Sequence, residues 1–160
     1  MKLVFSLLSL FPLLAAAQEC KLISEKDPYT REIKISSGAL SFQDAVLTID
    51  ADKKEIDFFF ELSGKCFNDA STVVIYYEGT RTKTTFRNAG SMNCDGYFHF
   101  KFRNGTATPT ALTRMQTLKV AQFIFKGSDD KEYTITLNPA QQQILQEVVG
   151  CVNTQSKALL

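Results

Sequence analysis

The chain has 160 residues, with 18 Lys and Arg against 17 Asp and Glu. This near balance excludes the strong positive charge with which many proteins attract nucleic acid or anionic membranes over a distance. We therefore expect no nucleic-acid partner. The length is sufficient for one domain with a substantial core.

Residues 1–17 have the pattern of a Sec-type signal peptide. Lys2 supplies the positive charge, residues 3–14 form the apolar segment, and small residues precede the cleavage site. The apolar segment is too short to span a bilayer comfortably, and no later segment is longer, so we expect no transmembrane segment. The lipoprotein alternative is disfavoured because the residue before Cys20 is not small. The sequence predicts a secreted or periplasmic protein whose residues 18–160 form one domain.

The first part of the mature chain predicts a hairpin and a longer strand. Residues 20–23 and 32–35 flank Asp27-Pro28, which favours a type I turn. Residues 39–49 predict the next strand. Its apolar positions change phase midway, so we expect a β-bulge near Gln43-Asp44.

Residues 55–103 predict a meander of four antiparallel strands around which the rest of the chain is organised. Residues 56–62 alternate between apolar and mainly acidic side chains, so one face is buried and the other is solvated. Residues 72–77 are β-branched or aromatic in both phases, as in a strand that is covered on both sides. Residues 81–87 and 97–103 alternate again, and the phenylalanines of the last strand face inward.

The C-terminal third predicts two helices and two strands. Thr108-Pro109 resembles an N-cap with proline at the first helical position, so a short helix follows it. Residues 118–126 and 132–137 predict strands joined by a polar turn. Asn138-Pro139 repeats the cap pattern and opens a helix to about Asn153, with apolar residues at helical spacing. The remaining tail is expected to fray.

All four cysteines lie in the mature chain. An even number in an exported protein indicates two disulfides, whereas a zinc site is disfavoured because no C-x-x-C pair is present. The connections that hold Cys66 and Cys94 are separated by two predicted antiparallel strands, so both lie at one end of the sheet. We predict the pairs Cys66–Cys94 and Cys20–Cys151.

Cationic side chains gather on the outer phase of the last two strands of the predicted meander. One interpretation is a platform for an anionic glycan, a lipid headgroup or a protein partner, to which an exposed aromatic adds contact area. The alternative is ordinary cross-strand pairing with the acidic phase of residues 55–61. The candidate binding residues are Arg81, Lys83, Arg87, Tyr97, His99, Lys101 and Arg103.

No constellation in the sequence indicates catalysis or metal binding. His99 is the only histidine and has no neighbouring signal for a nucleophile, which favours a solvated strand residue over a general base. Asp50-x-Asp52 and Asp129-Asp130 lack the glycine and distal glutamate of a calcium loop and are interpreted as turn residues. Asn104-Gly105-Thr106 matches a glycosylation sequon, which matters only in a eukaryotic host. We predict no catalytic residue, metal ligand or cofactor.

A set of segments spread over the chain carries a family resemblance. The segments are the Ala17-Gln18 junction, Lys65–Ala70, Met92–Cys94, Thr117–Val120 and the capped C-terminal helix. Through them nearly the whole chain resembles small secreted or periplasmic proteins of uncharacterised function from Bacteroidota. The resemblance implies export, and it implies no activity, ligand or catalytic residue.

These patterns predict an α+β fold dominated by an antiparallel sheet of about eight or nine strands. The sheet is expected to curl, to double into a sandwich or to form a partial barrel, with the C-terminal helix packed on it. The main functional hypothesis is an exported, non-enzymatic binding module that uses the basic outer face or the cavity of a curled sheet. The alternatives are a hydrolase-type enzyme with an unrecognised site and a purely structural envelope role.

The two predicted disulfides imply that the mature protein has no free thiol. We expect alkylation of the purified, denatured protein to modify none of its four cysteines before reduction and all four afterwards. Mass spectrometry of the intact chain gives both counts. Modification of all four cysteines without a reductant would contradict the disulfide assignment.

Overall fold

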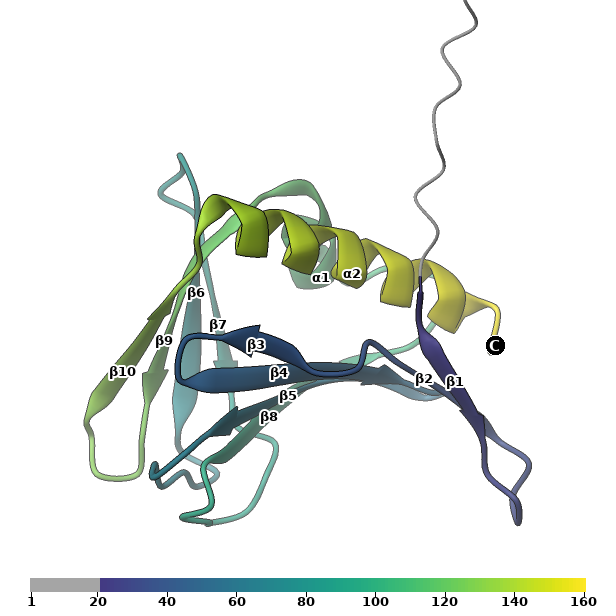
Figure 1. The fold of residues 1–160 in the computed structure, drawn as a ribbon, viewed down its shortest axis with the longest axis horizontal. Coiled ribbons are helices and arrows are strands. Elements are labelled where there is room, and N and C mark those ends of the chain that lie inside the picture. The colour runs from purple at the N-terminus through teal and green to yellow at the C-terminus, as the bar shows by residue number, and fades with distance from the viewer. Residues whose placement is uncertain (1–20) are drawn as a thin grey trace, which may run out of the picture.

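The computed structural model describes residues 21–160 and contains two antiparallel sheets with a long helix across them (Figure 1). The first sheet consists of β1 (Ile23–Lys26), β2 (Ile33–Ser36), β3 (Leu40–Phe42), β4 (Ala45–Ala51), β5 (Glu55–Leu62) and β8 (Tyr97–Arg103). The second sheet consists of β6 (Thr72–Tyr77), β7 (Lys83–Arg87), β9 (Val120–Lys126) and β10 (Glu132–Thr136). The helices are α1 (Thr110–Thr117) and α2 (Pro139–Lys157). The predicted signal peptide, residues 1–17, and Cys20 lie outside the described residues.

The strand order corrects the predicted four-stranded meander. The order is β1-β2-β4-β5-β8 in the first sheet, where β3 also pairs with β4, and β10-β9-β6-β7 in the second. The chain therefore changes sheet three times, between β5 and β6, between β7 and β8, and between β8 and β9. The pairing of β5 with β8 has a clear physical reason, because it places Phe58 opposite Phe100 and Phe60 opposite Phe98 on one apolar face.

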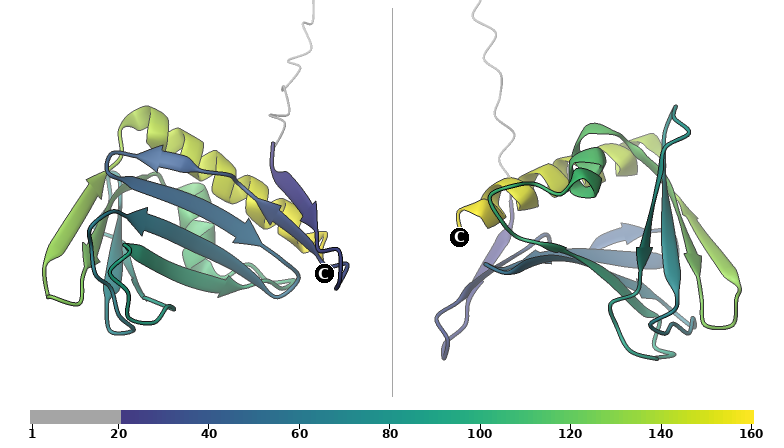
Figure 2. Two further views of the ribbon diagram at one scale, coloured as in Figure 1. Left: turned by 60° about the horizontal axis from the view of Figure 1, so that its bottom comes forward. Right: turned by 180° about the vertical axis from the view of Figure 1, so that it is seen from behind.

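The two sheets run in different directions and approach each other where β7 and β8 lie at their edges (Figures 1 and 2). There the ring of Phe86 stacks on that of Phe100 with centroids 4.2 Å apart, and the Ala89 N–H donates to the His99 carbonyl at 2.8 Å. Helix α2 packs against β2, β4 and β5 of the first sheet and against β9 of the second. The predicted α+β class, with the C-terminal helix packed on antiparallel sheets, is confirmed, and the sheets do not close into a barrel.

Phenylalanine side chains fill the space between the sheets and the helix. Phe60 of the first sheet makes edge-to-face contacts with Phe123 and Phe125 of the second, with centroids 5.1 and 5.0 Å apart. Such pairs add to the free energy of burial itself. The interior is therefore a packed core, and the cavity that a curled sheet was expected to offer is occupied by side chains.

The N-terminal hairpin is confirmed in part, and the predicted bulge is wrong. Strands β1 and β2 pair antiparallel around Asp27, whose carboxylate accepts hydrogen bonds from the N–H groups of Tyr29 and Thr30. At Gln43-Asp44 the chain turns completely, and β3 pairs with β4 as a separate strand. Gln43 has a positive φ of 50°, as a tight turn requires. A two-residue turn shifts the apolar phase as a bulge does, so the pattern alone did not separate them.

Helix α2 begins where the sequence predicted and ends later. The Asn138 side chain accepts from the Gln141 N–H at 2.9 Å, and the Gln141 side chain accepts from the Asn138 N–H at 3.0 Å, forming a capping box. The helix continues to Lys157 instead of about Asn153, and Leu159 packs against the core. The tail is therefore held by burial, which the expectation of fraying missed.

The predicted disulfide Cys66–Cys94 is confirmed, with a sequence separation of 28. It joins the β5–β6 and β7–β8 connections, two of the three that pass between the sheets, and beside it Phe67 and Asn93 exchange backbone hydrogen bonds of 2.8 and 2.9 Å. None of the cysteines within residues 21–160 is free. The pair Cys20–Cys151 stays a prediction, because Cys20 lies outside the described residues.

The Phe100 side chain contributes strongly to stability because it contacts aromatic rings from both sheets. It is 1% exposed, with ring centroids 4.9 Å from Phe58 and 4.2 Å from Phe86. We expect Phe100→Ala to lower the free energy of unfolding by about 3–5 kcal/mol. The matched control Phe59→Ala, on the outer face of the same sheet, should cost roughly 1 kcal/mol. Urea denaturation of both variants checks this. Equal losses would contradict the assignment of Phe100 as a main contact between the two sheets.

Candidate functional site

The predicted binding residues are divided between the two sheets. Arg81, Lys83 and Arg87 lie on or just before β7, at an edge of the second sheet. The others, Tyr97, His99, Lys101 and Arg103, lie on β8, at an edge of the first. The prediction that all of them share neighbouring strands of one sheet is wrong, because β8 pairs with β5 and β7 pairs with β6.

Two of the basic side chains on β8 contact carboxylates of the strand beside it. The Lys101 Nζ atom lies 2.5 Å from Glu55 Oε1 and 3.6 Å from Asp57 Oδ2, and the hydrogen bond that it donates to Glu55 is the main cause that raises the pKa of Lys101. His99 Nδ1 lies 3.0 Å from Asp57 Oδ2. Cross-strand pairing, the alternative interpretation of the basic face, thus accounts for these two side chains.

The ring of His99 is held on several sides. Its backbone N–H donates to the Asn88 side chain at 3.0 Å, and its ring contacts Phe59 edge-on at 5.9 Å. A Cβ atom added to Gly90 would lie only 3.1 Å from Nε2, so the loop passes close over the ring. Tyr97 packs on the other side of Phe59, at 5.4 Å, and remains 41% exposed. Within residues 21–160, no serine hydroxyl or cysteine thiol forms a hydrogen bond with His99.

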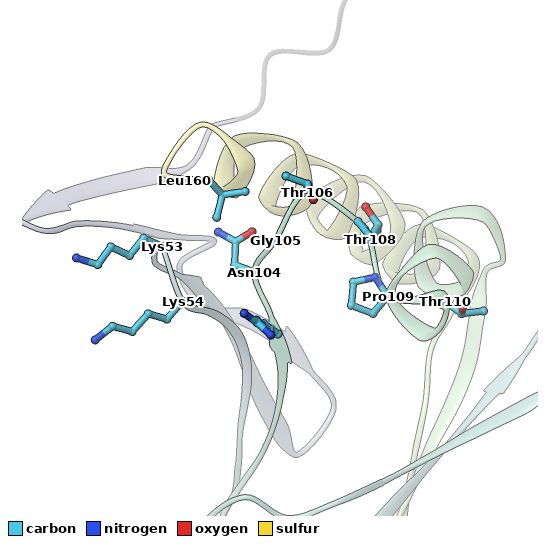
Figure 3. Close-up of a pocket in the computed structure, with 11 residues that line it drawn as sticks. Lys53, Lys54, Asn104, Gly105, Thr106, Thr108, Pro109, Thr110 and Leu160 are labelled. Carbon is cyan, nitrogen blue, oxygen red and sulfur yellow. The ribbon is translucent and has the colours of Figure 1, made fainter.

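Arg103, the last residue of β8, lines a groove of about 880 Å³. The groove forms where the β4–β5 turn, the segment after β8 and the C-terminal end of α2 come together (Figure 3). The lysines project from the turn at one end, and Pro109 and Thr110 lie at the other. Its lining residues are Lys53, Lys54, Arg103, Asn104, Gly105, Thr106, Ala107, Thr108, Pro109, Thr110 and Leu160.

The groove has a positive lining. Lys53, Lys54 and Arg103 are its charged side chains, and no Asp or Glu occurs among the described residues that line it. Lys53 forms an ion pair with Glu32 outside the groove. Lys54 and Arg103 have no ion-pair partner within residues 21–160. A concave surface with cations of one sign concentrates the positive potential and attracts anions.

Asp52 shapes the turn that carries the two lysines. Its carboxylate accepts hydrogen bonds from the N–H groups of Lys54 at 2.6 Å and Glu55 at 2.9 Å. Burial alone would raise the pKa of Asp52, but the hydrogen bonds from Glu55 and Lys54 lower it. The stabilisation is present above the ordinary aspartate pKa and is lost as the pH falls through the lowered value, so the turn is fixed at neutral pH.

Asn104 joins the three segments that form the groove. Its side-chain amide, 6% exposed as a residue, donates to the carbonyls of Asp52 and Ser156, both at 2.8 Å. Its backbone N–H donates to the Lys54 carbonyl at 2.8 Å. The sequon at Asn104 therefore has a structural role, since the amide nitrogen that would accept a glycan is buried and already bonded.

Thr108 does not cap α1 as predicted. The helix begins at Thr110, its N-cap position is Pro109, and no side chain caps it. The Thr108 hydroxyl instead accepts a hydrogen bond from Lys157 Nζ at 2.6 Å. The end of α2 thus fixes this wall of the groove. Local sequence gives no signal for this contact, because the two residues are far apart in the chain.

Comparisons with known proteins find no family model, curated protein or solved structure that matches the chain. Function therefore has to be argued from the geometry of the site. None of the helices in the described part of the chain combines the length and apolar character that a bilayer-spanning helix needs.

Removal of the Asn104 side chain should weaken the groove and the fold together. Asn104→Ala removes the side-chain donor to the carbonyls of Asp52 and Ser156, and we expect a loss of about 1–3 kcal/mol in the free energy of unfolding. The control Asn153→Ala removes a single 3.5 Å contact with Thr108 and should cost much less. Urea denaturation measures both, and equal costs would show that Asn104 does not have this joining role.

Proposed function

We propose that this protein is an exported, non-enzymatic binding module that holds an anionic ligand in the groove at Lys54 and Arg103. One observation carries the proposal: both cations line a concave surface, and neither has an ion-pair partner among the described residues. The groove volume of about 880 Å³ is in the range that accommodates small ligands.

The groove is a better candidate than the basic face of β8 as a whole. Lys101 and His99 already contact the carboxylates of β5, so an anion would have to compete with those contacts. Arg103 is the cation of β8 that remains available. Its guanidinium presents paired donors that match the two oxygens of a carboxylate, sulfate or phosphate group.

The lining also suggests what is attached to the anionic group. Away from the lysines, the groove presents the hydroxyl of Thr110 and the apolar surface of Pro109. This arrangement suits an anionic group joined to an uncharged body, as in an acidic glycan or a lipid headgroup. Export is supported by the pattern of residues 1–17 and by the Cys66–Cys94 disulfide, which is typical of oxidising compartments.

The proposal is tested with three defined probes: polygalacturonate, dextran sulfate, and vesicles of phosphatidylcholine with or without phosphatidylglycerol. Titration calorimetry for the polymers and co-sedimentation for the vesicles measure binding by the mature protein. We expect at least one anionic probe to bind, more weakly at high salt. Lys54→Glu/Arg103→Glu should reduce the affinity about tenfold or more, because each charge-assisted contact contributes about 1.5–3 kcal/mol.

The matched control is Arg81→Glu/Lys83→Glu, which makes the same charge change on the other sheet. It should retain binding, and circular dichroism should show that both variants are folded. The proposal is overturned if the wild type binds none of the probes, or if the control loses as much affinity as the groove variant. A loss of affinity in the control alone would overturn the groove and place the binding site at β7.

A further inference from the structure

The outer face of the second sheet is apolar at its centre and uncovered. Alternate residues of β6, β7, β9 and β10 point away from the core on this face, and half of them are β-branched. They are Thr72, Val74, Tyr76, Lys83, Thr85, Arg87, Gln122, Ile124, Lys126, Glu132, Thr134 and Thr136. Within residues 21–160, no helix or strand lies over this face, since both helices lie on the opposite side of the sheet (Figures 1 and 2).

The uncovered face contrasts with the sequence pattern of β6. That strand is apolar in both phases and was predicted to be covered on both sides, yet only Val73, Ile75 and Tyr77 are buried. Val74 and Tyr76 remain half-exposed. The sequence of β6 suits a strand that is buried on both faces, but only one face is buried. This difference suggests that a partner covers the other face.

We propose that a second copy of this chain covers the face, related to the first by a two-fold axis parallel to the strands. Residues that pair in register across the four strands form rows perpendicular to the strands. One row consists of Glu132, Lys126, Thr72 and Arg87, in the strand order β10-β9-β6-β7. The two-fold rotation reverses the order of residues within each row and keeps the position of each row along the strands. Each row of one copy therefore lies over the same row of the other, in reverse order. Glu132 of each copy then lies over Arg87 of the other, so the same contact forms twice.

The central row becomes the apolar centre of the interface. It reads Thr134, Ile124, Val74, Thr85, so its reversal places Val74 of one copy over Ile124 of the other. An apolar centre with charged pairs at the margin is the usual composition of a protein interface.

Charge supports this axis over the other possible one. Neither Arg87 nor Glu132 has an ion-pair partner within residues 21–160, so both are available to pair across the interface. An axis perpendicular to the strands would instead place Arg87 over Lys83 of the second copy, which are like charges. Lys126, nearer the centre, is already neutralised by Asp130 at 2.8 Å.

The size of the face sets the strength of the dimer. Four strands about 4.8 Å apart, with a rise of about 3.3 Å per residue, form a face of roughly 15–20 Å on each side. Such a face is smaller than a standard specific interface and falls in the range of weak, transient contacts, so we expect a reversible dimer in the high micromolar range. The formal net charge of +1 adds little repulsion between copies.

Sedimentation velocity over a series of concentrations tests the proposal on the mature protein. Arg87→Glu and Glu132→Arg each place like charges opposite one another twice, and each should weaken the dimer about tenfold or more. The double variant Arg87→Glu/Glu132→Arg exchanges the two charges and should restore the dimer. Val74→Arg should give a monomer, whereas the control Val46→Arg, on the outer face of β4, should leave the dimer unchanged.

A wild-type protein that stays monomeric through the micromolar range overturns the proposal. A dimer that withstands both single charge reversals, or one that the exchanged pair does not restore, overturns the proposed geometry. Circular dichroism and urea denaturation of every variant show whether a loss of dimer comes from unfolding. None of the four positions lines the groove, so the result is independent of the proposed anion site.

Discussion

The stack of Phe58, Phe100 and Phe86 determines where the two sheets meet, and the position of every other element depends on that joint. Phe100 lies on the last strand of the first sheet, and its neighbour Phe86 lies on the last strand of the second. The stack therefore brings two sheet edges together, with the Ala89–His99 hydrogen bond beside it, while β7 and β8 stay in separate sheets. The Cys66–Cys94 disulfide links two of the connections between the sheets, so a covalent bond and an aromatic stack both restrain how the two sheets are placed.

Alternation in the sequence predicted most strands correctly because it depends only on which side of each strand is buried. It did not predict which strands pair. The apolar face of residues 56–62 is compatible with several neighbouring strands. The predicted meander assumed that each strand pairs with the next one along the chain. In the structure β5 pairs with β8 instead, since that register aligns phenylalanines at two successive positions. This preference concerns residues about 40 apart, and no local pattern carries it.

The groove could not be predicted for the same reason. Its walls come from the β4–β5 turn, the segment after β8 and the end of α2, and they are held together by the amide of Asn104 and the ammonium group of Lys157. In the sequence, Asn104 matched a glycosylation sequon and Thr108 matched a helix cap. The residue types fit both motifs, but in the structure each side chain forms hydrogen bonds with a partner from another element. Arg103 alone among the groove cations was a predicted binding residue.

The change of sheet between β7 and β8 divides the predicted basic face into parts with different surroundings. On β8, Lys101 and His99 contact the acidic side chains of β5, so both are engaged within the fold. Arg103 lies opposite Glu55 in the register, forms no ion pair with it, and lines the groove. Arg87 lies on the other sheet, beside an apolar face that nothing in residues 21–160 covers. Basic residues that share one phase in the sequence therefore differ in their surroundings according to which carboxylates the fold places near them, and those without an ion-pair partner in the described residues are the ones that we propose to contact a ligand or a second chain.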